Sequence, residues 1–282
     1  MKIKTVRKSS SWLTTSTFVL LSSFAFTPVM LSAEESAEEK GLRLAKASDQ
    51  RDLGFGDFVA DMQMILRNRA GEKSSRKIRN RTLEGHGDGD KSMSLFDDPA
   101  DVKGTAMLTF SHGLNPDDQW LYLPALKRVK RISSRNKSGP FMGSEFAFED
   151  LGSEEVEKYE HLFLREEACD GDQGWQCYVS QRIPAYQYSG YSKQIGWMDT
   201  KEYRPIKIEF YDRKGDLLKT LTWKNYQEYS IPSGEKTFWR ADQMEMKNHQ
   251  TGKISTLNWT NYQFSTGLDE NDFNKNALKR LF

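Results

Sequence analysis

The titratable side chains of this 282-residue chain form none of the patterns that common enzyme classes require. The chain contains no H-E-x-x-H, G-x-S-x-G, P-loop or G-x-G-x-x-G sequence. Its four histidines stand far apart and read best as solvated polar residues. We therefore predict that the protein is not an enzyme and uses no cofactor and no metal. The four histidines are His86, His112, His161 and His249.

Three short acidic stretches are the remaining candidates for chemistry. Asp88-Gly-Asp90 is reminiscent of a calcium loop, but no twelve-residue loop with a terminal Glu follows it. Asp97-Asp98 and Asp117-Asp118 place neighbouring carboxylates together, as acid–base catalysis can require. Each pair also falls in a predicted turn, where Asp is common. We interpret both pairs as turn residues.

Methionines and aromatic residues recur in the segments that alternate like strands. The chain has 10 Met and 34 aromatic side chains. Methionine is flexible and polarisable, so it suits pockets for variable apolar ligands as well as ordinary cores. Both interpretations stay open, and the second is a lipid cavity inside a half-open barrel. The candidate cavity residues are Met62, Met64, Leu66, Met107, Trp120, Tyr122, Phe146, Ile208, Phe210, Met244 and Met246.

A basic segment stands out between residues 127 and 137. It carries six cations in eleven residues. One interpretation is a solvated edge strand whose charges prevent aggregation. The other is a docking surface for an acidic partner or for phosphate head groups. The candidate docking residues are Lys127, Arg128, Lys130, Arg131, Arg135 and Lys137.

Cys169 and Cys177 are the only two cysteines. An even number in an exported chain favours a disulfide, and the spacing is not that of a C-x-x-C redox motif. We predict a structural disulfide that closes a short loop.

The first 33 residues resemble a secretory signal peptide. Four cations precede a mostly apolar run, Trp12–Leu31, and small residues around Ala33 offer a cleavage site. Removing them leaves 37 Lys and Arg against 40 Asp and Glu, a net charge of −3. This near-balance does not support nucleic-acid binding. We expect an exported protein in which residues 34–282 form a single domain.

The elements that must position these residues are mostly strands. Glu34–Leu53 is rich in helix formers and predicts an amphipathic helix. From Met62 onwards, apolar residues recur at every second position, with hairpin turns every 8–15 residues. The acidic stretch Glu145–His161 suggests partial helix. The pattern predicts a mainly β fold with helices at its start and middle, built on a curved antiparallel sheet or barrel of ten or eleven strands.

Four segments resemble motifs of the outer-membrane lipoprotein-sorting protein family, which is LolA-like. The resemblance extends over residues 40–280. The segments are Asp101–Ala106, Asp118–Ile132, Gly143–Leu151 and Tyr203–Asp212.

This resemblance implies an incomplete antiparallel β-barrel of about eleven strands, covered by helices that act as a lid. It also implies a monomeric periplasmic carrier in a Gram-negative bacterium, which binds acyl chains of a lipid or lipoprotein and moves them towards the outer membrane. The expected partner is an inner-membrane exporter of the RND/MMPL type. In the carrier proper an arginine holds the lid; Arg67 or Arg69 could do so here, although no motif matches there. The alternative is a non-transporting adaptor that docks on an exporter through the basic segment.

Overall fold

A computed structural model of the chain divides it into two units, Met1–Glu34 and Glu35–Phe282. All contacts described below lie within the second unit. Apart from Met1 and Thr5, the predicted signal peptide lies outside the described residues, which are 1, 5, 34–153, 155–170, 174–231, 234 and 236–279.

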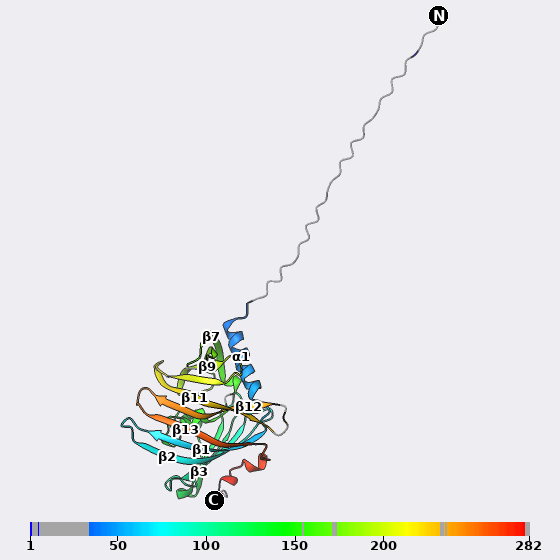
Figure 1. The fold of residues 1–282 in the computed structure, drawn as a ribbon. Helices are drawn as coiled ribbons and strands as arrows, with labels where there is room; N and C mark the ends of the chain where they lie inside the picture. The colour runs from blue at the N-terminus through cyan, green and yellow to red at the C-terminus, as the bar shows by residue number, and fades with distance from the viewer. Residues whose placement is uncertain are drawn as a thin grey trace. The chain divides into compact units, whose positions relative to one another are not determined.

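The second unit begins with helix α1, Ala37–Asp52 (Figure 1). Ser36 caps its first turn: the Ser36 side chain accepts from Glu39 N–H, and the Glu39 carboxylate accepts from Ser36 N–H. The helix buries only Gly41 and Leu44. Within the described part of the chain, no helix combines the length and apolarity needed to cross a membrane.

Within the described residues, thirteen antiparallel strands form one open sheet, which confirms the predicted fold class. Their order is β6-β5-β4-β3-β2-β1-β13-β12-β11-β10-β9-β8-β7, so β1 pairs with β13 in the middle and the sheet does not close. The strands are β1 Asp57–Arg67, β2 Lys73–Leu83, β3 Lys91–Asp98, β4 Ala106–Phe110, β5 Asp118–Leu123, β6 Arg128–Ile132, β7 Tyr159–Ala168, β8 Gln176–Pro184, β9 Tyr191–Asp199, β10 Pro205–Asp212, β11 Leu217–Ser230, β12 Thr237–Asn248 and β13 Ile254–Phe264.

The strand count exceeds the predicted ten or eleven. One reason is β7, which begins inside the acidic stretch that was expected to be partly helical. Its residues are half-buried or exposed, so β7 lacks the clean alternation that marks a strand in the sequence. The expected helix in the middle of the chain is instead a series of short 3-10 turns between Ser134 and Lys158.

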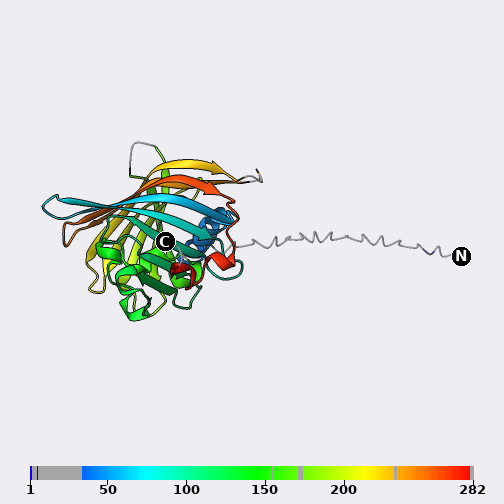
Figure 2. The same ribbon diagram turned by 90° about the horizontal axis from the view of Figure 1, so that it is seen from below.

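Residues 133–153 and 155–158, here called the plug segment, cover part of the sheet's inner face. Figure 2 shows β11, β12, β13 and β1 curving over this green segment and over α1. Phe141 and Phe146 of the plug segment are buried among strand side chains. These two residues and the strand side chains around them form the inner cluster. Its buried members are Met62, Met64, Ile78, Phe96, Val102, Met107, Leu121, Phe141, Phe146, Tyr191, Ile208, Phe210, Leu221, Met246 and Leu257.

A buried lysine fixes the plug segment to the sheet. Lys219 Nζ of β11 donates to the Asp150 carboxylate at 2.7 Å and to the Glu145 carbonyl at 2.9 Å. The side chains of Lys219 and Asp150 are both buried, and removing one partner of such a pair leaves an uncompensated charge inside the protein. Glu149 adds hydrogen bonds from Tyr186 and Ser189. The plug segment is therefore a specifically anchored part of the core.

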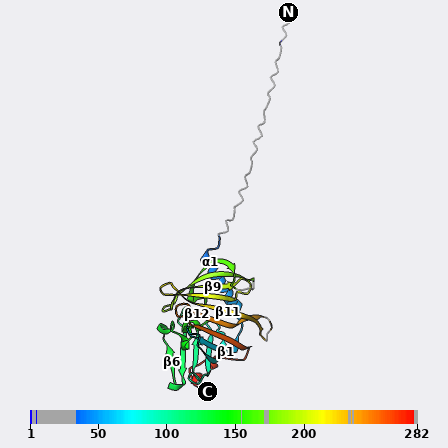
Figure 3. The same ribbon diagram turned by 60° about the vertical axis from the view of Figure 1, so that its left-hand side comes forward.

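The other face of β3, β4 and β5 carries a second, outer cluster. Residues 265–279 run back over these strands from the end of β13, and Figure 3 shows this red segment at the lower end of the sheet. Consequently the four residues Ala106–Thr109 of β4 are all buried, since both faces of that strand are covered. The outer cluster is Met93, Leu95, Ala106, Leu108, Trp120, Phe273 and Leu278.

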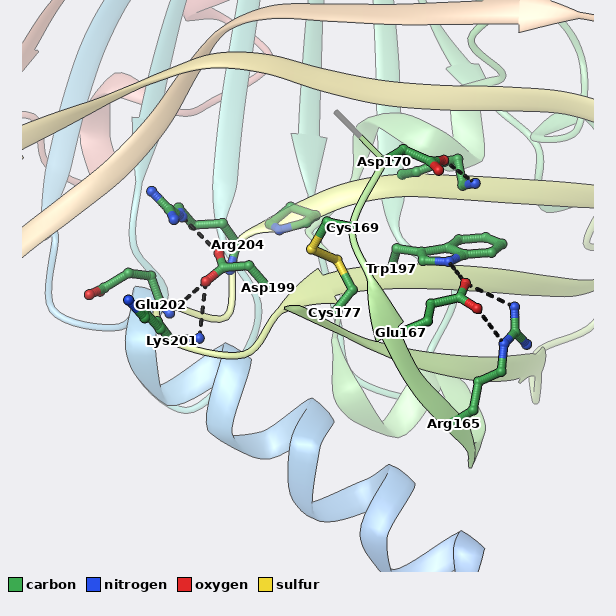
Figure 4. The surroundings of a disulfide bond; sticks show 12 residues. Arg165, Glu167, Cys169, Asp170, Cys177, Trp197, Asp199, Lys201, Glu202 and Arg204 are labelled. Atoms are coloured by element: carbon green, nitrogen blue, oxygen red, sulfur yellow. Dashed lines mark hydrogen bonds and ion pairs between the residues drawn. A yellow bond between two sulfur atoms is a disulfide. The ribbon is translucent and has the colours of Figure 1, made fainter. Parts of the chain in front are cut away.

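The predicted disulfide is present and joins the hairpin of β7 and β8. Cys169 and Cys177 are bonded, with their Cα atoms 5.1 Å apart (Figure 4). Cys177 packs with Val179 and Trp197 in a small cluster near the sheet edge. The bond therefore stabilises the edge against which α1 packs.

The loop after β2 ties the end of α1 to the sheet. Glu84 accepts hydrogen bonds from Gly54 N–H and Gly56 N–H. Both glycines have positive φ, which is why glycine suits this link. Asp90 accepts from Gly85 N–H at 3.0 Å. Burial, together with the charges of Glu155 and Glu84, raises the pKa of Asp90 to about 6.

Replacing both cysteines by alanine should lower the free energy of unfolding by about 2.5 kcal/mol, the chain-entropy value for so short a loop. Urea unfolding of the variant and of the oxidised wild type would measure this. Reduced wild type is the control and should match the variant. Equal stability of all three would contradict a stabilising role.

Asp90→Asn should raise the free energy of unfolding at pH 8 by on the order of 1–3 kcal/mol and leave it unchanged at pH 4. The folded protein holds the Asp90 proton up to about pH 6, whereas the unfolded chain loses it near pH 4. Wild-type stability therefore falls as the pH rises through this window. The amide oxygen can still accept from Gly85. Urea unfolding at both pH values is the measurement, and a pH-independent difference would refute the assignment.

Candidate functional site

A cavity of about 1210 Å³ lies between α1 and the part of the inner face that the plug segment leaves uncovered. Leu44, Ala45 and Ser48 of α1 line it on one side. Strands β10–β13 supply the opposite wall, and residues 151–153, 155 and 156 of the plug segment border it. The cavity and the inner cluster share Ile208, so they occupy the same face of the sheet.

Large aromatic side chains dominate the strand wall of this cavity. Trp223, Trp239 and Trp259 lie on three neighbouring strands, with Phe58 and Tyr262 beside them. Trp259 stacks on Tyr262 with ring centroids 6.0 Å apart. The indole N–H groups of Trp239 and Trp259 are buried without a hydrogen-bond partner. The wall thus offers a wide apolar surface, and the two indole N–H groups are sealed within it.

The rim of the cavity is acidic on the side of the 84–90 loop. Asp49 of α1, Asp88, Asp90, Glu155 and Glu157 all line it. Burial and the charges of Glu155 and Glu157 raise the pKa of Asp49.

Polar contacts hold α1 over the cavity. Arg51 donates to the Glu202 carboxylate at 2.8 Å and to the Thr237 carbonyl at 2.7 Å. Lys236 donates to the Gln50 carbonyl at 3.0 Å, and Arg240 pairs with the Asp52 carboxylate. Partly exposed pairs of this kind each contribute about 0–1 kcal/mol.

Arg67 and Arg69, which could have held a lid although no motif assigns them that role, do not make these contacts. Arg67 and Arg69 lie at the far end of β1 and are exposed. Gly41 shows how closely α1 approaches the sheet at β7: a Cβ there would lie 2.8 Å from the backbone nitrogens of Leu162 and Phe163. Arg51, Lys236 and Arg240 hold the helix instead.

The predicted cavity residues divide into three groups. Ile208 and Met244 line the cavity. Trp120 and Tyr122 pack with the outer cluster, on the other side of the sheet, because alternate residues of a strand point to opposite faces. The others pack in or against the inner cluster around the plug segment, and a ligand-binding role for them stays a prediction: Met62, Met64, Leu66, Met107, Phe146, Phe210 and Met246.

The aromatic residues of the strand wall, here called the tryptophan wall, were not among the predicted cavity residues. Trp223, Trp239 and Trp259 occupy consecutive strands of the same meander, and that spacing was visible in the sequence. The missing information was that Phe141 and Phe146 fill the methionine-rich part of the inner face. The free space is therefore displaced towards the last three strands.

The basic segment forms the edge strand β6 and its flanks. Lys127, Arg128 and Lys130 are exposed, and Arg131 is exposed but pairs with Asp118. Arg135 is exposed and lies over the Tyr188 ring.

Lys137 is a correction to the predicted docking set. It is 7% exposed, and its Nζ donates to the Asp117 carbonyl. Burial lowers its pKa. Lys137 serves the anchoring of the plug segment and cannot contribute to an exposed docking surface.

Comparison with known proteins places this geometry in a family. A family model described as an uncharacterized protein matches residues 88–280. An outer membrane lipoprotein-sorting protein domain from Vibrio parahaemolyticus is 57% identical, with a TM-score of 0.81, over 86% of this chain and 100% of that chain. A DUF1329 family protein from Desulfovibrio piger is 30% identical, with a TM-score of 0.78, over 86% and 99%.

A LolA superfamily protein from Nitrosomonas europaea shares the fold, with a TM-score of 0.65 and 20% identity over 84% of this chain and 98% of that chain. No curated protein matches the chain. The high identity to the Vibrio protein over its whole length agrees with the motif resemblance and with the open, helix-covered sheet. The chain belongs to the outer membrane lipoprotein-sorting protein family.

Proposed function

We propose that the protein binds acyl chains of a lipid or lipoprotein in the cavity beneath α1. The aromatic wall of this cavity is the observation that carries the proposal. Its volume of about 1210 Å³ exceeds the ~300–1,000 Å³ that is usual for small-molecule sites. Burying an acyl chain there contributes about 0.8 kcal/mol per CH₂. The role is that of a binding protein rather than an enzyme.

The proposed setting is the periplasm of a Gram-negative bacterium. Removal of residues 1–33 as a signal peptide would release residues 34–282 as a single carrier domain. Its task there is to carry its cargo towards the outer membrane, in contact with an inner-membrane exporter of the RND/MMPL type. The family to which the chain belongs supports this direction of transport, since its Vibrio relative is described as sorting outer membrane lipoproteins.

A second candidate function is that of an adaptor that docks on an exporter without carrying lipid. The exposed cations of β6 favour it, because β6 is an open edge of the sheet and the mature chain is otherwise acidic. The two functions use different surfaces, so variants can separate them.

Ala45→Trp should weaken the binding of a fluorescent fatty acid such as cis-parinaric acid at least tenfold, because the indole would occupy the cavity that Ala45 lines. Equilibrium fluorescence titration is the measurement. Leu42→Trp is the matched control: it adds the same side chain to α1 at an exposed position and should leave affinity unchanged. Equal affinity of both variants would place acyl binding elsewhere.

The triple variant Lys127→Glu, Arg128→Glu and Lys130→Glu should retain wild-type lipid affinity, because these residues lie outside the cavity lining. If the basic segment docks on the exporter, the charge-reversed variant should no longer bind inner-membrane vesicles that contain the exporter. Cosedimentation with such vesicles measures this. Loss of lipid affinity in the variant would contradict the separation of the two surfaces.

A further inference from the structure

Arg204 occupies an unusual position in the cavity wall, at the end of the turn between β9 and β10. Arg204 lines the cavity and is only 8% exposed. Its Nε donates to the Asp199 carboxylate at 2.7 Å (Figure 4). Asp199 is 2% exposed, so this is a buried ion pair that closes the turn.

The oxygens of the Asp199 carboxylate are occupied by hydrogen-bond donors of this turn. Its two oxygens accept from the backbone N–H groups of Lys201, Glu202 and Arg204 as well as from Arg204 Nε. Burial alone would raise the pKa of Asp199, but these hydrogen bonds hold it below its ordinary value. The carboxylate is therefore fixed as an anion and engages only one edge of the guanidinium.

The two terminal nitrogens of Arg204 are uncommitted. Among the described residues, no group accepts a hydrogen bond from Nη1 or Nη2. These atoms are also not among the solvent-sealed polar atoms that lack a partner, so they reach the cavity. Arg51 provides the contrast: it lines the same cavity, but its Nε, Nη1 and Nη2 all donate to Glu202 or Thr237.

Aromatic rings surround the Arg204 guanidinium. Its central carbon lies 4.1 Å from the Trp175 ring centroid, 4.4 Å from that of Trp239 and 5.5 Å from that of Tyr226. The rings exclude water from the cation and leave its donor edge as the approach for a ligand. A desolvated guanidinium offers two parallel N–H donors, which match the oxygens of a carboxylate or phosphate.

We propose that Arg204 binds the oxyanion head group of an amphiphilic ligand whose acyl chain lies along the tryptophan wall. The proposal rests on the proposed lipid-binding function and specifies its ligand class. The same turn also contacts α1, because Ser48 Oγ donates to the Tyr203 carbonyl and Arg51 pairs with Glu202. A bound head group would thus sit directly beside the contacts that hold α1 in place.

The test compares ligands of equal chain length and different head groups: dodecanoic acid, lysophosphatidic acid with a dodecanoyl chain, dodecanol and dodecylamine. Displacement of a fluorescent fatty acid reports each affinity. Wild type should bind at least one of the two oxyanion ligands about tenfold more tightly than dodecanol and should bind dodecylamine most weakly. The two oxyanion arms distinguish a carboxylate from a phosphate source.

The double variant Asp199→Asn with Arg204→Gln should lose this preference and retain its affinity for dodecanol. It removes both charges together, so no buried carboxylate is left unpaired. Arg43→Gln is the matched control and should keep the preference, because Arg43 is exposed on α1, pairs with Glu35 and lies outside the cavity lining. Circular dichroism would establish that each variant is folded; if the double variant is not, the wild-type ligand series alone decides.

Two outcomes are distinguishable. If wild type binds all four ligands equally, or the double variant keeps the oxyanion preference, the Arg204 site is refuted while lipid binding stands. If wild type binds none of them, the proposed function itself fails.

Discussion

The burial of the sheet's inner face is the constraint on which the rest of the structure depends. A curved sheet of thirteen strands presents a large apolar surface on this face. Exposing that surface to water is unfavourable, so other parts of the chain must cover it. The plug segment covers one part with Phe141 and Phe146 and makes a dense core. Helix α1 covers the rest without filling it. This division of one face creates the cavity.

The plug segment and α1, which both cover the inner face, are held by different kinds of interaction. The plug segment contributes large buried rings and a buried lysine–aspartate pair. Displacing it would therefore expose apolar surface to water and leave the charge of Lys219 without its partner. Helix α1 buries only Gly41 and Leu44 and is held mainly by partly exposed ion pairs and caps. Such contacts are individually weak. The contacts that hold α1 are therefore individually weaker than those that anchor the plug segment.

Much of this fold could be predicted from the sequence, because local patterns encode local structure. The alternation at Met62 and Met64 predicted β1, and the helix formers before Gly54 predicted α1. The placement of Trp120 could not be predicted, since a shift of one residue moves a side chain to the other face of a sheet. The path of the plug segment could not be predicted either. Its 3-10 turns follow no periodic pattern, and its anchor, Lys219, lies on a strand far away in the sequence. The family motifs supplied the architecture but not the site of the free space.

We propose that acyl chains occupy the space between α1 and the tryptophan wall. The most direct measurement is a crystal structure of residues 34–282 grown with a saturating long-chain fatty acid. Continuous density for the chain between Leu44 and Trp259, two residues that line the cavity, is the predicted result. A cavity that contains only water, with the fatty acid bound elsewhere or absent under saturating conditions, would contradict the account.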